Sequence, residues 1–134
     1  MFTDINILAV IVVAILAVAI GNIWYSPLLF GIAWVRALGK SEHEFSFTRA
    51  ELVIIVFRTL IINTLFFGVI SWLLTHDSLN SPATIASVLL ATTVTYSANV
   101  AIWEKRSLLY VFIHVGYAAI ILFGGAYVIA YWPW

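Results

Sequence analysis

Four long apolar windows follow one another along the chain, and each is almost free of charged residues. A helix that crosses a bilayer needs about 20 apolar residues. Runs such as ILAVIVV at residues 7–13 do not alternate between apolar and polar positions, as the strands of a transmembrane β-barrel would. The pattern therefore predicts four transmembrane helices, at about residues 5–25, 50–74, 83–103 and 108–131.

The first charge-free window is longer than one span. Residues 5–35 would form a helix of about 46 Å at 1.5 Å per residue, whereas the hydrocarbon core is about 30 Å thick. Pro27 has no N–H to donate and disfavours helix at Ser26. We therefore expect the first helix to break at Pro27, and residues 28–38 to form a short amphipathic helix at the interface.

Two of the predicted helices begin with capping residues. Thr48 and Glu51 form a T-x-x-E capping box, in which each side chain bonds the backbone N–H of the other residue. Ser81 followed by Pro82 places a capping hydroxyl before a proline at the first helical position. These motifs predict where the second and third spans begin.

The composition agrees with a chain dissolved in lipid. Of its 134 residues, 64% are hydrophobic and 9% are charged, whereas soluble domains average about 45–50% and about 25%. A disordered chain, a disulfide scaffold and a nucleic-acid binder are excluded as well, because the chain is apolar, has no cysteine and has no net charge. The sequence therefore predicts an all-α, four-helix membrane bundle that contacts lipids and forms one domain over residues 1–134.

The basic residues predict the orientation of the bundle. Five of the six Lys and Arg residues lie in the two segments that join the first span to the second and the third span to the fourth. The opposite side of the membrane has none, and short loops rich in Lys and Arg stay in the cytoplasm. We therefore expect a multi-pass protein of the inner membrane with both termini outside the cytoplasm.

One stretch of the chain resembles a known family. Residues 21–31 read GNIWYSPLLFG, and Trp34 and Gly39 follow. This pattern resembles the N-terminal signature of the domain of unknown function 1761 family, and Asn99, Glu104 and the Gly116-Tyr117 pair are similar to residues of its last third. The resemblance implies a small, four-span, mostly bacterial membrane protein. It implies no established activity and no catalytic residues.

The polar residues of the spans lie at similar depth, in the cytoplasmic third of the membrane. They are Asn22, Arg58, Tyr96, Asn99 and His114. With Tyr25, which we expect to face the bundle, and Glu104, at the end of the third span, they are the candidates for binding a lipid or another ligand. We expect them to approach one another around a cytoplasm-facing pocket.

Arg58 and His114 each allow several interpretations. A charged residue costs about 2.5–3.5 kcal/mol at the centre of a spanning helix. The Arg58 side chain therefore reaches out to lipid phosphate, pairs with Glu104 or Glu51, or binds an anionic ligand. His114 either donates a hydrogen bond to a neighbouring helix or relays protons, and it lacks the Cys or carboxylate neighbours that a metal site needs.

Two helix faces are unusual for their small or polar residues. On the third span an arc of about 120° contains Thr84, Thr92, Thr95, Tyr96 and Asn99. This arc either bonds to other helices or lines a hydrophilic path. On the first span Ala14, Ala17 and Gly21 form a close-packing face, whose partner lies in the same chain or in another.

No motif indicates enzymatic chemistry. The chain has no G-x-S-x-G, H-E-x-x-H, C-x-x-C or phosphate-binding glycine loop. We therefore expect a protein that is not an enzyme and uses no cofactor or metal. The favoured interpretation is a structural or accessory subunit that forms a homo-oligomer or binds a membrane complex or lipid. The alternative is a small oligomeric channel or transporter for a polar or anionic solute.

Overall fold

The computed structural model describes residues 5–76 and 81–133. Within these ranges all regular structure is helical: α1 (Ile7–Trp24), α2 (Gly31–Ala37), the 3-10 helix η1 (Glu42–Phe45), α3 (Arg49–His76), α4 (Pro82–Trp103) and α5 (Leu108–Ala130). The helices α1, α3, α4 and α5 are each long and apolar enough to cross a membrane. Their bounds lie within two residues of the ranges expected from the charge-free windows, and the all-α fold with four candidate spans is confirmed.

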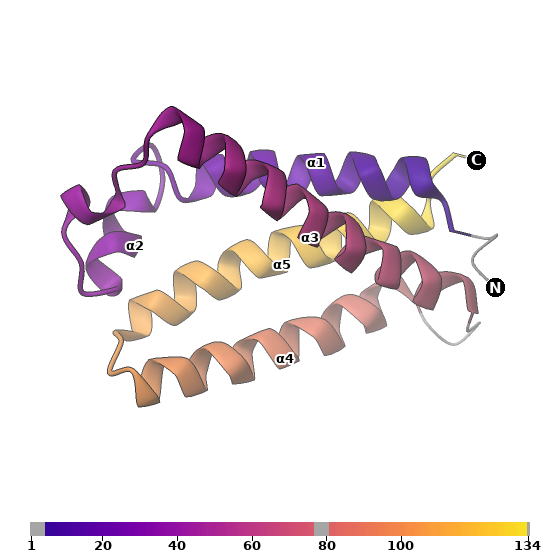
Figure 1. Ribbon diagram of the computed structural model, residues 1–134. Coiled ribbons are helices and arrows are strands. Elements are labelled where there is room, and N and C mark those ends of the chain that lie inside the picture. The colour runs from indigo at the N-terminus through magenta and orange to yellow at the C-terminus, as the bar shows by residue number, and fades with distance from the viewer. Residues whose placement is uncertain (1–4, 77–80, 134) are drawn as a thin grey trace.

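Helix α5 holds the bundle together, because it contacts each of the other four α-helices. Helix α4 packs along the length of α5, and α3 packs mainly against α1. Figure 1 shows that α1 begins and α5 ends at one end of the bundle, while α2 lies at the opposite end. Helix α4 forms one edge of the bundle, on the far side of α5 from α1 (Figure 1).

The core lies where α1, α3 and α5 cross. Ala9 and Ala14 of α1, Phe67 and Ile70 of α3, and Ala126 of α5 are all buried to 1% exposure or less. Small residues let the three helices approach closely. Ala17 is also buried, at 2% exposure. The small-residue face of α1 thus packs against helices of the same chain.

Helix α3 belongs to this core through its C-terminal half only. Its buried residues are Phe67, Ile70 and Ser71, whereas every residue from 49 to 59 is exposed. The N-terminal half of α3 therefore stands away from the other helices, and its apolar side chains are exposed.

The capping residues occupy their expected places. The Glu51 carboxylate accepts hydrogen bonds from the N–H and the hydroxyl of Thr48, both at 2.8 Å, and the Glu51 N–H donates to the Thr48 hydroxyl at 3.3 Å. The Ser81 hydroxyl accepts from the Thr84 N–H at 3.1 Å, and Pro82 is the first residue of α4.

A closed turn separates α1 from α2. The N–H of Phe30 donates to the Trp24 carbonyl at 3.0 Å, and the N–H of Gly31 donates to the Ser26 carbonyl at 2.9 Å. These bonds hold residues 26–30 outside a regular helix, so α2 begins at Gly31, three residues later than the sequence suggested. A Cβ at Gly31 would lie 2.5 Å from the Tyr25 carbonyl oxygen, so only glycine fits there.

Helix packing predicts different effects for the same substitution at two adjacent glycines of α5. A Cβ at Gly125 would clash with the Phe67 ring and would lie 2.9 Å from Val13, whereas a Cβ at Gly124 meets nothing within 4 Å. We expect Gly125→Val to lower the free energy of unfolding by about 1–3 kcal/mol relative to Gly124→Val. Thermal unfolding in detergent, followed by tryptophan fluorescence, measures the difference. Equal midpoints for the two variants would contradict this packing.

Candidate functional site

Five rings join the end of α1, helix α2 and helix α5. The Tyr25 ring lies edge-on to Trp34 and to Tyr117, with centroids 4.8 Å and 5.4 Å away. Trp34 stacks on Tyr110 at 5.0 Å and on His114 at 6.0 Å. Ring pairs at these separations add about 0.5–1.5 kcal/mol each beyond the area they bury. We call this group, Tyr25, Trp34, Tyr110, His114 and Tyr117, the aromatic cluster.

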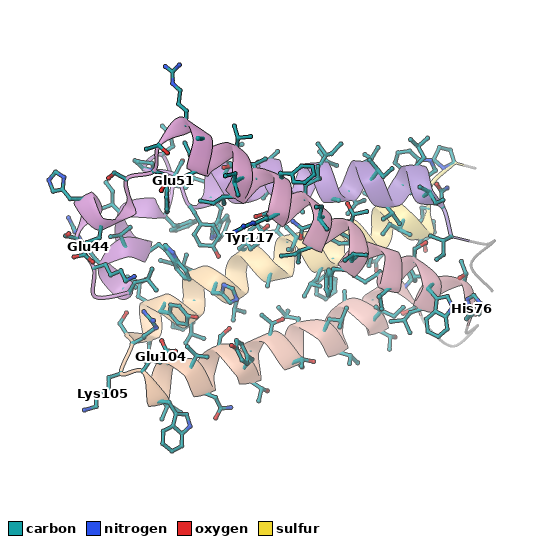
Figure 2. All side chains as sticks on the ribbon, in the orientation of Figure 1. Glu44, Glu51, His76, Glu104, Lys105 and Tyr117 are labelled. Carbon is teal, nitrogen blue, oxygen red and sulfur yellow. The ribbon has the colours of Figure 1, made fainter. Side chains whose placement is uncertain are left out.

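Two hydrogen bonds seat α1 on α5 beside the aromatic cluster. The Trp24 indole N–H donates to the Ile113 carbonyl at 3.0 Å, and the Tyr117 hydroxyl donates to the Ala17 carbonyl at 3.0 Å. Each ring lies over a glycine of the facing helix. A Cβ at Gly116 would lie 3.1 Å from the Trp24 ring, and a Cβ at Gly21 would lie 3.1 Å from the Tyr117 hydroxyl. Figure 2 shows Tyr117 reaching across from α5.

The Tyr25 hydroxyl lies 3.4 Å from His114 Nδ1, a long hydrogen bond between α1 and α5. A tyrosine phenol is protonated at neutral pH, so the Tyr25 hydroxyl is able to donate a hydrogen bond. This geometry favours the structural interpretation of His114, which packs half-buried among rings.

Arg106 lies just before α5 beside the aromatic cluster, just after the turn that joins α4 to α5. Its guanidinium pairs with the Glu104 carboxylate, with Nε 2.6 Å from Oε2, and donates to the Leu38 carbonyl at 3.2 Å. It also lies 5.4 Å from the centroid of the Tyr110 ring. Figure 2 shows Glu104 at the turn that joins α4 to α5. Arg106 therefore ties the end of α2 to this turn.

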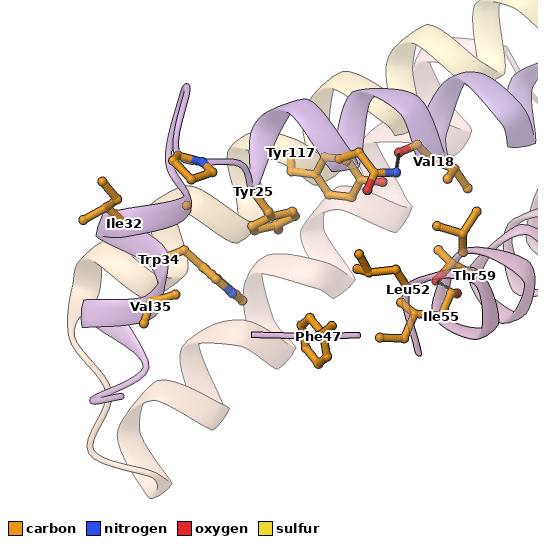
Figure 3. A pocket seen from close by; sticks show the side chains of 15 residues that line it. Val18, Tyr25, Ile32, Trp34, Val35, Phe47, Leu52, Ile55, Thr59 and Tyr117 are labelled. Atoms are coloured by element: carbon orange, nitrogen blue, oxygen red, sulfur yellow. Dashed lines mark hydrogen bonds between the residues drawn. The ribbon is translucent and has the colours of Figure 1, made fainter. Parts of the chain in front are cut away.

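A cavity of about 640 Å³ opens between α1, α2 and the N-terminal half of α3. Asn22, Tyr25 and Tyr117 line it on one side and Leu52, Ile55 and Thr59 on the other, as Figure 3 shows for most of these side chains. The other lining residues are Val18, Gly21, Pro27, Gly31, Ile32, Trp34, Val35, Phe47 and Val56. Among the residues that the structure describes, none with a charged side chain lines the cavity.

The structure divides the seven candidate residues into separate groups. Asn22 and Tyr25 line the cavity, and His114 contacts it through Tyr25. Arg58 is exposed on α3 and does not line the cavity. Tyr96 and Asn99 are exposed on α4.

Glu104 does not pair with Arg58, which was one of the interpretations that the sequence left open for Arg58. The Glu104 carboxylate binds Arg106, two residues along the chain, where little conformational entropy is lost on pairing. Helix α3 meanwhile contacts α4 only weakly. The single polar layer expected from depth alone is therefore not one pocket.

The sequence does not identify the hydrogen bonds by which Trp24 and Tyr117 hold α1 on α5, or the contact of Arg106 with the end of α2. A signal was nonetheless present in the sequence. Trp24 is the last residue of α1 and Tyr25 is its C-cap, and the Gly116-Tyr117 pair lies on α5. The sequence does not show how α1 packs on α5, which brings Trp24 and Tyr25 next to Ile113 and Tyr117.

The turn lies within the stretch GNIWYSPLLFG at residues 21–31, which also contains Tyr25 of the aromatic cluster. The family model described as "Protein of unknown function (DUF1761)" matches residues 8–130. The chain belongs to this family. The match extends over nearly all of α1 to α5, and it includes the turn, the aromatic cluster and the cavity lining of this DUF1761 protein. No curated protein and no solved structure matches the chain.

The hydrogen bond from Trp24 predicts a difference between two tryptophans. We expect Trp24→Phe to lower the free energy of unfolding by about 0.5–1.5 kcal/mol, because the bond to the Ile113 carbonyl is lost. The matched control is Trp103→Phe, since Trp103 is 83% exposed, and we expect it to change stability by less than about 0.5 kcal/mol. Thermal unfolding in detergent compares them. A control as destabilised as Trp24→Phe would show that this bond adds nothing.

Proposed function

We propose that this protein is a non-enzymatic accessory protein of the membrane that binds a lipid in the cavity between α1, α2 and α3. The observation that carries the proposal is the cavity itself. Its volume of about 640 Å³ lies within the range of small-molecule sites, about 300–1,000 Å³. Apolar walls with a few polar groups are also typical of such sites.

The cavity is accessible to molecules in the bilayer. Its α3 wall consists of side chains that the rest of the chain leaves uncovered, such as Leu52 at 46% and Ile55 at 41% exposure. Phe47, just before α3, is 46% exposed as well. A lipid tail that entered between α1 and α3 would cover this apolar surface, which supports a ligand with a hydrocarbon chain.

The polar groups of the cavity favour a ligand whose buried part carries no charge. Asn22 donates to the Val18 carbonyl at 2.9 Å, which leaves its side-chain oxygen as an acceptor. Tyr25 contributes a protonated hydroxyl. An unpaired charge in such surroundings would be strongly disfavoured. We therefore favour the acyl chains and ester groups of a lipid, with its headgroup outside the cavity.

The same observation weakens the alternative of a channel or transporter for an anionic solute. That alternative depended on a pocket containing both Arg58 and His114. In the described part of the chain, Arg58 is not a lining residue and no other cation replaces it.

We also propose that the chain spans the inner membrane with both termini outside the cytoplasm. The five basic residues of the two loops support this orientation. Pro27, which lies between α1 and α2, would end the first span. Helix α2 would then lie at the cytoplasmic interface, with Trp34 directed toward α5 and Arg36 exposed.

Filling the cavity tests the lipid proposal. Ile55 lines the cavity, whereas Ile54 is similarly exposed and does not. We expect Ile55→Trp to lower the amount of lipid that stays bound to the purified protein several-fold, because the indole occupies the cavity. Ile54→Trp is the matched control and keeps the wild-type amount. Native mass spectrometry counts the bound lipids, and equal retention by both variants would refute the proposal.

The orientation is tested separately, by labelling single cysteines in a chain that otherwise has none. Ser41 precedes η1, and Ser78 follows α3 in a stretch outside the described residues. In intact cells we expect an impermeant thiol reagent to label Ser78→Cys and not Ser41→Cys. Permeabilised cells serve as the control in which both react. The opposite labelling pattern would reverse the orientation.

A further inference from the structure

Helix α4 differs from the other long helices in the side chains that it turns outward. The exposed positions of α1, α3 and α5 are mostly large and apolar, including Ile7, Phe57 and Phe112 at 67%, 62% and 74% exposure. Helix α4 is the least apolar of the four candidate spans. Its exposed positions include Thr84, Ser87, Thr92, Thr95, Tyr96 and Asn99.

Six exposed residues, three of them polar, form a continuous line along α4. Thr84, Val88, Ala91, Thr95, Asn99 and Ile102 are spaced by three or four residues, and all are exposed. This spacing keeps them on one face of a helix. The face lies opposite the residues Ile85, Ala86, Ser97 and Ala101, which α4 buries in the bundle. We call it the outer face of α4.

The polar side chains of the outer face differ in whether their hydrogen bonds are made within the chain. The Thr84 hydroxyl lies 2.9 Å from the Ser81 hydroxyl, and the Thr95 hydroxyl donates to the Ala91 carbonyl of its own helix at 2.9 Å, so neither needs a further partner. Asn99 donates one N–H to the Thr95 carbonyl at 2.9 Å. Its side-chain oxygen and its second N–H have no partner within the described part of the chain.

The depth of Asn99 in the proposed membrane orientation decides whether its remaining amide groups need a partner. It lies four residues before the end of α4 at Trp103, about 6 Å along the helix axis. In the proposed orientation it therefore faces hydrocarbon near the cytoplasmic interface. Lipid tails offer no hydrogen bonds, so an amide at this depth is stabilised by a partner that both donates and accepts.

We propose that the outer face of α4 packs against the same face of a second copy, around a two-fold axis along the membrane normal. Two copies of a membrane protein share one orientation, so each residue of this face meets its counterpart at the same depth. An amide is complementary to itself. The two Asn99 side chains are therefore able to exchange N–H···O bonds that the single chain leaves unmade.

The shape and the place of the outer face suit such a contact. Ala91 and the threonines are small, so two helix backbones are able to approach closely. The small-residue face of α1 is not available, because Ala14 and Ala17 are buried within the chain. The cavity lies between α1, α2 and α3, on the far side of α5 from α4 (Figure 1). Pairing through α4 is therefore independent of the proposed lipid site.

Cysteine cross-linking tests the interface, because the wild-type chain has no cysteine. Thr95→Cys places a thiol at the centre of the outer face. Val94→Cys, one residue earlier and 39% exposed in the wild type, points about 100° away and is the matched control. With the full chain in phosphatidylethanolamine and phosphatidylglycerol vesicles, a copper–phenanthroline oxidant should convert Thr95→Cys, and not Val94→Cys, to a covalent dimer. Only monomer from both, or equal dimer from both, would overturn the proposal.

The contribution of the amide is measured with a second pair of variants. Asn99→Leu removes the reciprocal bonds, and we expect it to weaken dimerisation in the same vesicles about tenfold. Asn99→Gln keeps an amide and should recover part of the loss. Energy transfer between labelled copies at varied dilution in lipid reports the change. If Asn99→Leu dimerises as well as the wild type, the outer face is not held together by this amide pair and the proposal fails.

Discussion

A polar group inside the hydrocarbon of a bilayer has no water to bond, so it is stabilised by a partner within the protein. The Trp24 indole and the Tyr117 hydroxyl each donate to a carbonyl of the facing helix, and the two bonds hold α1 on α5. The threonines of α4 donate to carbonyls of their own helix. Glycines at Gly21 and Gly116 then matter because they let the two polar rings come close enough to bond.

The same constraint explains how much of the fold could be predicted from the sequence. Long charge-free windows locate the four spans, because any charge inside them is costly, and the capping residues Thr48 and Ser81 mark where two of the helices begin. Periodicity also placed Tyr96 and Asn99 correctly on one face of a helix. It does not say which way a face points, and this one points away from the bundle. The spacing of Tyr110, His114 and Tyr117 places these three rings on one helix face, whereas Tyr25 and Trp34 join them through a turn that periodicity does not describe.

Two surfaces are not covered by other helices among the described residues, and they lie on opposite sides of α5. On one side the N-terminal half of α3 stands away from α1 and α2, which leaves the cavity. On the other side α4 presents the exposed Tyr96 and the Asn99 amide, whose oxygen and second N–H have no partner among the described residues. The first surface is mainly apolar and fits a lipid chain, and the second is polar and fits its own copy. Neither of the proposed roles, binding a lipid and pairing with a second copy, requires a catalytic group.

A structure of the protein determined in lipid nanodiscs would show directly whether the cavity between α1, α2 and α3 holds a lipid, as we propose, or is an empty gap. We expect α3 to stay apart from α2 and elongated density to fill the space between Trp34 and Ile55. The polar end of this density should lie near the cytoplasmic surface. The contradicting result would be an α3 packed against α2, with the side chains of Leu52 and Ile55 in contact with Trp34 and no space left between them.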